Sequence, residues 1–200
     1  MLPLGHLALA YLTYAVVAGA RYIHDRRRLL PTRWALLPLA VGSQFPDLID
    51  KPLAYYEILA YGRSFAHSIL TFTSCCVIVW WLSRTLAARW DSDSWQDTLR
   101  ARTPTAFAVG YATHLLGDAW NAIAAGRLHD IKFVLWPLYR LPGGAADNVA
   151  PWTRMLRYYQ QMNTHPQGSL IVLAVVLFVL LRVGKRLYDR RNVQSQDHGR

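Results

Sequence analysis

The stretch PLGHLALAYLTYAVVAGARY, residues Pro3–Tyr22, decides the fold class of the chain. Its only charged side chain is Arg21, and its length matches the roughly 20 residues that a helix needs to cross the hydrocarbon core of a bilayer. Similar apolar runs recur at Phe65–Leu86, Thr105–Ala125 and Gly168–Val183. Apolar residues make up 53% of the chain and charged residues only 17%, and the apolar ones are gathered in these runs. The sequence therefore predicts an all-α, polytopic membrane helical bundle.

A further apolar stretch, WALLPLAVGSQFPDLID at Trp34–Asp50, has the length of a span but not the sequence of a regular helix. Pro38, Gly42 and Pro46 lie inside it, and a proline removes one helical hydrogen bond and clashes with the preceding turn. We therefore expect a broken helix here. Irregular backbone at membrane depth is tolerated only where protein buries it or where it lines a wet cavity, so a break would indicate a site.

The positions of the basic residues predict the topology. Arg26–Arg28 follow the first apolar run, Arg84 and Arg89 follow another, and the C-terminal tail is also basic. Such loops stay in the cytoplasm, and all three can do so only if Trp34–Asp50 crosses as well. This gives about five spans with the second one broken, the N-terminus outside and the C-terminus in the cytoplasm. The basic loop Gly126–His165 would then lie outside, against the charge rule.

The net charge of +10 at pH 7 raises the question of nucleic-acid binding. The basic residues are bunched at the ends of apolar runs, as in contacts with lipid headgroups, and no nucleic-acid recognition motif accompanies them. We therefore expect membrane lipids and no nucleic acid as partners. Residues 1–188 are predicted to form a single membrane-embedded helical domain of the inner or plasma membrane, and residues 189–200 a disordered, basic cytoplasmic tail.

Histidine and aspartate interrupt the apolar runs at a few places. A charged side chain at membrane depth costs about 2.5–3.5 kcal/mol on insertion scales, so such residues are rare without a use. The candidates are His6, Asp47, Asp50, His67, His114 and Asp118. His114 and Asp118 are four residues apart and share one face of a helix. In the predicted topology the candidates lie at similar depth in the outer half of the bundle, so we expect them to meet in one pocket near the external leaflet.

Three imidazoles and two or three carboxylates suit a divalent metal ion, with Zn²⁺ the first choice and Mn²⁺ or Mg²⁺ as alternatives. The predicted ligands are His6, Asp47, His67, His114 and Asp118. Asp50 would orient a ligand from behind or act as a general base, and Arg63 would contact an anionic group. A metal here would lower the pKa of bound water and polarise a phosphoryl or acyl oxygen, which favours a catalytic site.

Each candidate also has a purely structural interpretation. His6 could be an interfacial residue near the chain terminus. Ser64 could cap a helix that holds His67 in its first turn. The histidine–aspartate pair in HLLGD could form only a structural hydrogen bond or a proton relay. Asp50 could simply pair with Lys51 or with an arginine.

Taken together, GHLALAYL, GSQFPDLIDKP, GRSFAHSIL and GYATHLLGDAW resemble the YdjM-type inner-membrane family of predicted metal-dependent hydrolases, some of whose members are LexA-regulated. The resemblance covers roughly Gly5 to Pro137, and its wording is similar to archaeal, particularly haloarchaeal, members. It implies an all-helical membrane domain with a divalent metal site and presumed hydrolysis, distantly similar to zinc-dependent phospholipase C. The family's motifs match this chain at His6, Asp47, Asp50, His67, His114 and Asp118.

One motif departs from the family pattern. Many members read HRGxTHS where this chain reads GRSFAHS, so Gly62 stands in place of a histidine and Ala66 in place of a threonine. The site therefore has one candidate ligand fewer.

The leading hypothesis is a membrane-bound metal-dependent hydrolase that acts on a lipid or lipid-linked phosphoester at headgroup depth. The main alternative is a non-enzymatic cation or proton-coupled transporter, in which the same side chains bind the translocated ion. A third possibility is a structural membrane protein that keeps a residual metal site.

Overall fold

The computed structural model describes residues 3–24, 33–89, 100, 102–139, 149–160 and 167–197. Within these ranges the backbone is helical or irregular, and no strand is present. The helices in chain order are α1 (Pro3–His24), α2 (Arg33–Tyr55), α3 (Ile69–Ala87), α5 (Thr103–Ala124), the 3-10 helix η2 (Leu128–Leu135), α6 (Pro151–Gln160) and α7 (Gln167–Asp197). The all-α prediction is thus confirmed for the described part of the chain.

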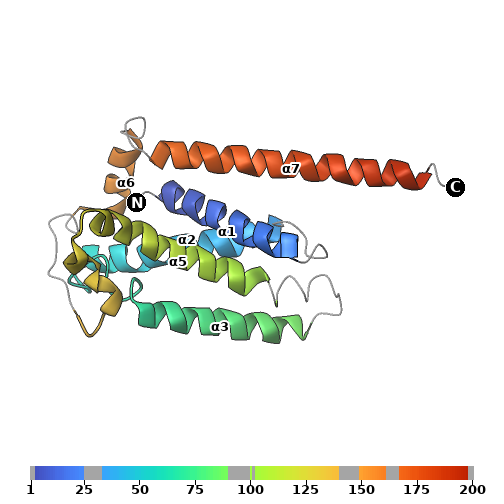
Figure 1. The fold of residues 1–200 in the computed structure, drawn as a ribbon. Helices are drawn as coiled ribbons and strands as arrows, with labels where there is room; N and C mark the ends of the chain where they lie inside the picture. Colours follow the sequence, from blue (N-terminus) through green and yellow to red (C-terminus); the bar gives the residue numbers. More distant parts are fainter. Residues whose placement is uncertain are drawn as a thin grey trace.

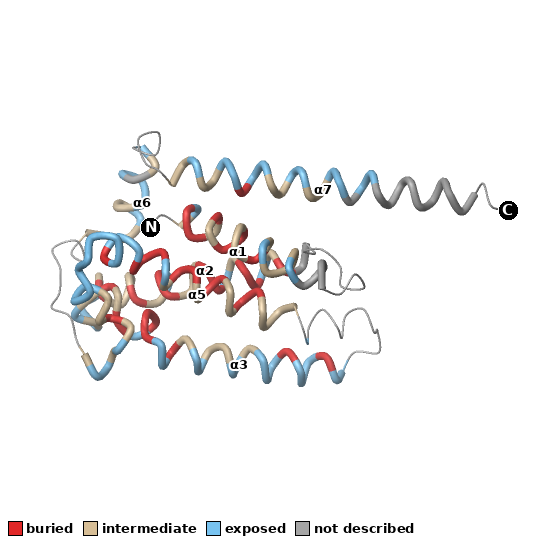
Figure 2. The backbone as a smooth tube through the Cα atoms, in the orientation of Figure 1, coloured by how far each residue is buried: buried red, intermediate tan, exposed pale blue. Residues whose placement is uncertain are grey.

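The long helices α1, α2, α3, α5 and α7 run along a common axis, and successive ones alternate in direction (Figure 1). Helices α2 and α5 have the most extensive mutual contact; α1 and α3 pack against α5, and α7 packs against α1. Figure 2 shows the buried segments concentrated in α1, α2 and α5, whereas α3 and α7 are mostly exposed or half-buried. The core of the bundle therefore lies around α2 and α5.

The two central helices approach each other at glycines. A Cβ atom on Gly42 of α2 would overlap the backbone carbonyl of Phe107, and one on Gly110 of α5 would overlap the carbonyl of Leu39 and the amide nitrogen of Ser43. Small residues at such crossings let helix backbones come close enough for tight packing in membrane proteins. This close approach fixes α2 and α5 relative to each other.

Three of the described helices are long and apolar enough to cross a membrane: Pro3–Ala20 within α1, Ile69–Ala87, and Gln167–Gly184 within α7. The sequence predicted about five spans, so α2 and α5 depart from that expectation. Both have the length of a span but carry aspartate and other polar residues that reduce their apolar character. Because they form the centre of the bundle, other helices rather than lipid cover much of their surface, and polar residues that face a bundle interior are compatible with a membrane.

Helix α2 is continuous, so the prediction of a broken second span is wrong. Pro38, Pro46 and Pro52 all lie inside the helix. Such prolines are tolerated where neighbouring helices supply partners for the disturbed backbone groups. In the turn before Pro46, the carbonyl oxygen of Ser43 lies 2.7 Å from Nδ1 of His114, which belongs to α5. The neighbouring helix thus supplies a hydrogen-bond donor to a carbonyl in the turn that precedes Pro46.

Residues 56–68 form an irregular connection between α2 and α3, and His67 lies in it rather than in a helix. The N-cap of α3 is Ser68, whose Oγ accepts a hydrogen bond from the backbone N–H of Thr71 at 3.1 Å. The interpretation in which Ser64 caps a helix that contains His67 is therefore wrong. A connecting segment can place its side chains at angles that a regular helix cannot, and this matters for the site.

Helix α7 keeps its helical backbone to Asp197, so it extends into residues 189–200, for which the sequence predicted a disordered tail. Residues that continue a helix already formed each add a hydrogen bond, which favours such an extension. The division into one membrane domain and a cytoplasmic tail stays a prediction. The basic residues Arg26, Arg27 and Arg28, on which the predicted topology partly rests, lie outside the described residues.

Candidate metal centre

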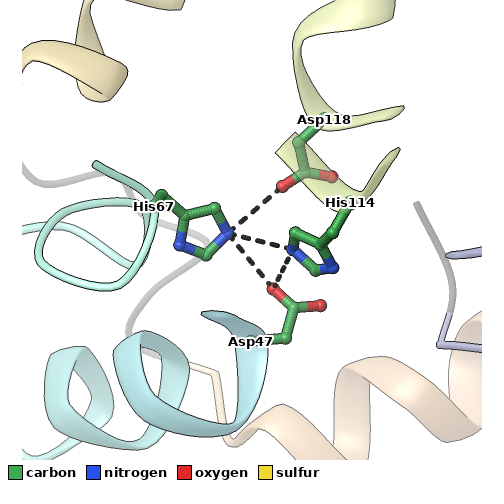
Figure 3. Close-up of side chains that lie close together, drawn as sticks. All are labelled: Asp47, His67, His114 and Asp118. Atoms are coloured by element: carbon green, nitrogen blue, oxygen red, sulfur yellow. Dashed lines mark hydrogen bonds and ion pairs between the residues drawn. The ribbon is translucent and has the colours of Figure 1, made fainter. Parts of the chain in front are cut away.

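Four side chains from three parts of the fold converge at one end of the bundle (Figure 3). They are Asp47 of α2, His67 of the connection 56–68, and His114 and Asp118 of α5. Each offers one ligand atom, and these atoms all lie within 4.8 Å of one another. All four residues are buried. A group of two imidazoles and two carboxylates with this spacing could hold a metal ion.

Asp50 fixes the orientation of His67. Its carboxylate accepts hydrogen bonds from the backbone N–H groups of Ser64 at 2.8 Å, Ala66 at 2.8 Å and His67 at 3.1 Å. The same carboxylate lies 2.8 Å from His67 Nδ1. With three backbone N–H donors on the carboxylate, Nδ1 of His67 acts as the donor in this contact, and Nε2 is the ring nitrogen that lies beside Asp47, His114 and Asp118. Carboxylates in this position commonly orient histidines that bind metals.

His114 is oriented in the same way by a backbone group. Its Nδ1 lies 2.7 Å from the carbonyl oxygen of Ser43, and a carbonyl can only accept a hydrogen bond. Nδ1 of His114 is therefore the donor, and Nε2 is the ring nitrogen that points to the cluster. The Nε2 atoms of His67 and His114 face each other at 3.2 Å. A metal ion beside this pair would be bound by both nitrogens in their unprotonated form.

The remaining distances agree with a shared ion. Asp47 Oδ1 lies 3.6 Å from Nε2 of both His67 and His114, and Asp118 Oδ2 lies 3.5 Å from Nε2 of His67. Ligand atoms of a tetrahedral Zn²⁺ site with bonds of about 2.0–2.1 Å are about 3.4 Å apart. Asp47 Oδ1 is also buried and makes no hydrogen bond among the described residues, so its lone pairs are available to an ion. The residues present therefore fit a metal.

Two cationic side chains contact the carboxylates from the outer side of the cluster. Lys51 forms an ion pair with Asp47 through Oδ2, and Arg63 donates from Nε to Asp118 Oδ2 at 2.7 Å. The Lys51 and Arg63 side chains are 27% and 37% exposed, whereas those of Asp47 and Asp118 are nearly inaccessible. Burial alone would lower the pKa of the Arg63 guanidinium, but the adjacent Asp118 carboxylate outweighs it and raises that pKa. Arg63 is therefore a permanent positive charge.

His6 borders the cluster but is not one of its four members. Its ring stacks on the ring of His114, with centroids 3.8 Å apart and an interplanar angle of 18°. Nε2 of His6 lies 3.3 Å from Asp118 Oδ1. The residue is fully buried, yet neither ring nitrogen makes a hydrogen bond among the described residues. A further nitrogen donor is thus available beside the carboxylate of Asp118.

The six histidine and aspartate candidates from the sequence thus lie together in space, and their individual roles stay predictions. Sequence reasoning missed two supporting residues. The hydroxyl of Tyr111 donates to the carbonyl of Ala66 and so anchors the backbone beside His67. Phe133 of η2 packs edge-on against the His67 ring, with centroids 6.0 Å apart. Tyr111 lies one helical turn before His114, which is a usable signal, whereas no sequence pattern links Phe133 to the site.

One structural interpretation of the sequence paired Lys51 with Asp50. In the structure Lys51 pairs with Asp47, four residues earlier on α2, and not with Asp50, which is occupied by the backbone of the connection 56–68. Residues four apart on a helix share a face, so the spacing alone contained this information.

The chain belongs to the YdjM inner membrane protein family, whose model matches residues 1–193. The family expected from the sequence motifs is therefore confirmed. No curated protein and no solved structure is significantly similar to the chain. The family description names a membrane, in agreement with the three apolar helices, and does not name a reaction.

Proposed function

We propose that the protein is a membrane-bound metal-dependent hydrolase that acts on a lipid or lipid-linked phosphoester at headgroup depth. One observation carries the proposal: two histidine nitrogens, Nε2 of His67 and Nε2 of His114, face each other at 3.2 Å between two buried carboxylates. A buried cluster of this kind is costly to build unless it binds a cation. Partly exposed cations beside it offer a place for an anionic substrate.

In this proposal Asp47, His67, His114 and Asp118 hold the ion, and His6 adds a fifth ligand or orients Asp118. Two imidazole ligands favour Zn²⁺ over Mg²⁺, which prefers oxygen ligands and water; Mn²⁺ is intermediate. When bound, the ion would supply Lewis acidity and a water molecule of lowered pKa. Both oxygens of Asp50 already accept hydrogen bonds, so this residue is assigned to positioning His67 rather than to general-base catalysis.

The charge of the site favours a phosphoester over a neutral ester or amide. The carboxylates of Asp47, Asp50 and Asp118 carry three negative charges, and Lys51 and Arg63 carry two positive ones. A divalent ion changes the net charge of this group from one negative to one positive. An anionic phosphoryl group then restores neutrality, and the planar guanidinium of Arg63 suits two of its oxygens.

The position of the site supports a substrate at the membrane surface. His6 lies near the beginning of the span Pro3–Ala20, and His67 lies just before the span Ile69–Ala87, so both belong to the same end of the bundle. Arg84 lies in the last turn of α3, and Arg182 lies near the end of the span Gln167–Gly184, so both are at the end of the spans opposite the site. By the positive-inside rule, the basic end is cytoplasmic and the site faces outside. This orientation, and the crossing of α2 and α5 as additional spans, are part of the proposal.

The transporter alternative loses its main support. It relied on a broken second span whose irregular backbone would form an ion pathway. Helix α2 is continuous and offers no such break. Cation uptake into proteoliposomes, abolished by Asp118→Asn, would restore this alternative.

The first test is the metal content of purified protein, measured by elemental analysis for the wild type, for His114→Ala and for His129→Ala. His129 is a matched control because it is a histidine whose side chain is exposed and lies outside the cluster. We expect about one tightly held divalent ion in the wild type and in His129→Ala and none in His114→Ala. A wild-type protein without metal after growth and purification in Zn²⁺, Mn²⁺ or Mg²⁺ would mean that the two Nε2 atoms share a proton instead.

The second test separates an enzyme from a structural metal site. Hydrolysis of a chromogenic aryl phosphodiester and of short-chain phospholipid in mixed micelles is measured for the wild type and for Arg63→Gln. We expect turnover that falls at least about tenfold in kcat/KM in Arg63→Gln, while the metal content is unchanged. Metal binding without turnover of either substrate would assign the cluster a structural role.

A further inference from the structure

We infer that α6, Pro151–Gln160, lies in the membrane–water interface, with one apolar face inserted into the lipid at the end of the bundle that holds the metal centre. The inference rests on which side of α6 faces the protein and on where α6 lies in the bundle. It does not depend on the proposed hydrolase function.

The apolar residues of α6 share one face of the helix. At 3.6 residues per turn, Trp152, Met155, Leu156 and Tyr159 fall on one side. Most of this face is exposed: Trp152 is 55% exposed, Met155 40% and Leu156 59%, while Tyr159 is half-buried. The side chains of Thr153 and Arg154, on the other face, are half-buried instead.

This arrangement is the reverse of a helix on a water-soluble surface. In water, the apolar face of an amphipathic helix packs on the protein and the polar face is solvated. Here the large apolar side chains point outward from a ten-residue helix that also carries Arg154 and Arg157. Short amphipathic helices with tryptophan on one face and basic residues on the other are typical of segments that lie in the interface plane.

The place of α6 in the fold agrees with this position. Figure 1 shows α6 across the end of the bundle at which α1 and α7 begin, rather than alongside the long helices. The spans Pro3–Ala20 and Gln167–Gly184 both start at this end, which is therefore where the hydrocarbon core ends. Tyr55, at the C-terminal end of α2, holds α6 in place through an edge-to-face contact with Trp152, with centroids 5.6 Å apart. Trp and Tyr are enriched at this depth in membrane proteins.

The same end of the bundle exposes other apolar side chains around the metal centre. Leu128 and Leu135 of η2 are exposed, as are Leu138 just after it and Phe65 beside His67. Phe65 packs edge-to-face against Trp136, with ring centroids 5.5 Å apart. Exposed apolar side chains thus occur on α6, on η2 and in the connection 56–68, at the end of the bundle where the spans Pro3–Ala20 and Gln167–Gly184 begin. The occupant to which these side chains are best suited is therefore lipid.

The experiment measures the surroundings of α6 by spin labelling of full-length protein in lipid nanodiscs. Cys75 and Cys76, the free cysteines of the described chain, are first changed to serine. A nitroxide is attached to Leu156→Cys and, as the matched control, to Arg157→Cys, the exposed neighbour on the polar side of the same helix. Collision rates are then measured with oxygen, which concentrates in lipid, and with a water-soluble nickel complex.

We expect the ratio of oxygen to nickel accessibility to be at least about fivefold higher at position 156 than at position 157, as a difference in depth requires. Equal ratios at the two positions, both close to those in water, would overturn the inference. A label at 156 that is shielded from both reagents would overturn it as well, because protein would then cover this face. In that case, dipolar broadening between labelled copies would identify the covering protein as a second copy of the chain.

Discussion

Helices α5 and α7 are both long, yet they place their side chains in opposite ways. In α7 the apolar run Gln167–Gly184 has only 6% of its residues buried, and many of its Leu and Val side chains are exposed. In α5 the buried residues include a histidine, an aspartate and two glycines, among them His114 and Asp118. The strongest hydrophobic signal in the sequence therefore marks the surface that faces lipid. The chemistry lies on the helix that other helices shield from lipid.

The comparison explains how polar residues are accommodated in a bundle of this kind. A helix that touches lipid along most of its length pays in free energy for each polar group, whereas a central helix can pair such groups with its neighbours. Asp118 meets Arg63, His114 meets the Ser43 carbonyl, and Asp50 meets three backbone N–H groups. The substitutions described next change either the shielded central helices or the lipid-facing helix α7.

The largest effect on the free energy of unfolding is expected from a substitution at Asp50. The change Asp50→Ala leaves the backbone N–H groups of Ser64, Ala66 and His67 without their acceptor in a buried place. Each such donor costs about 1–3 kcal/mol, so the free energy of unfolding should fall by about 4 kcal/mol. SDS-induced unfolding in mixed micelles measures this change.

A matched control for Asp50→Ala is Asp130→Ala, since Asp130 is an exposed aspartate that pairs with Arg127 at the surface. Exposed pairs contribute less than about 1 kcal/mol, so this variant should unfold nearly like the wild type. Similar losses for the two variants would mean that Asp50 does not organise the connection 56–68. The variant Asp50→Asn, which keeps one acceptor oxygen, should lie between them.

The same contacts show which parts of the site could be predicted from the sequence. The family motifs and the depth argument led to all six histidine and aspartate candidates, which the fold does bring together. They could not predict that Asp50 is held by the backbone of the connection 56–68, because this depends on how a segment without regular structure turns. The contact of Phe133 with the site could not be predicted for a related reason. Phe133 approaches His67 through the packing of η2, and an apolar side chain does not by itself indicate a functional site.

The second-largest effect on the free energy of unfolding is expected where the central helices α2 and α5 cross. Gly110→Ala puts a methyl group against the Leu39 carbonyl and the Ser43 amide nitrogen, which are backbone atoms and cannot rotate away. Overpacking of this kind costs about 1–3 kcal/mol, and moving α2 away from α5 should also displace Ser43 from His114. We therefore expect an unfolding free energy about 2 kcal/mol lower and a weakened metal affinity.

Gly184→Ala is the matched control for this variant, because nothing lies within 4 Å of a Cβ atom at Gly184 in α7. Alanine is favoured over glycine inside a helix by up to about 1 kcal/mol, so Gly184→Ala should be neutral or slightly stabilising. If Gly110→Ala unfolded like Gly184→Ala, the central helices would not be as close as the glycines indicate.

The fold itself was predictable to the extent that apolar runs reveal helices. The runs around α1, α3 and α7 were found because their composition is dominated by contact with lipid. The continuity of α2 was not predictable. Pro38 and Pro46 disfavour a helix locally, and only the packing of α5 on α2 compensates for them. Local propensity is a weak guide wherever a neighbouring helix supplies hydrogen-bond partners.

The smallest effect on the free energy of unfolding is expected in α7, for a side chain that faces lipid. A large side chain two residues earlier, which contacts α1, provides the comparison. Phe178 packs edge-to-face against Tyr11 of α1, with ring centroids 5.9 Å apart, whereas Leu180 is exposed. In a bilayer, Leu180→Ala exchanges one lipid contact for another and should change the unfolding free energy by less than about 0.5 kcal/mol. Phe178→Ala removes a contact between helices and should cost about 1.5 kcal/mol. A loss at Leu180 as large as that at Phe178 would mean that this face of α7 packs against protein, and α7 would then belong with α5 in the comparison.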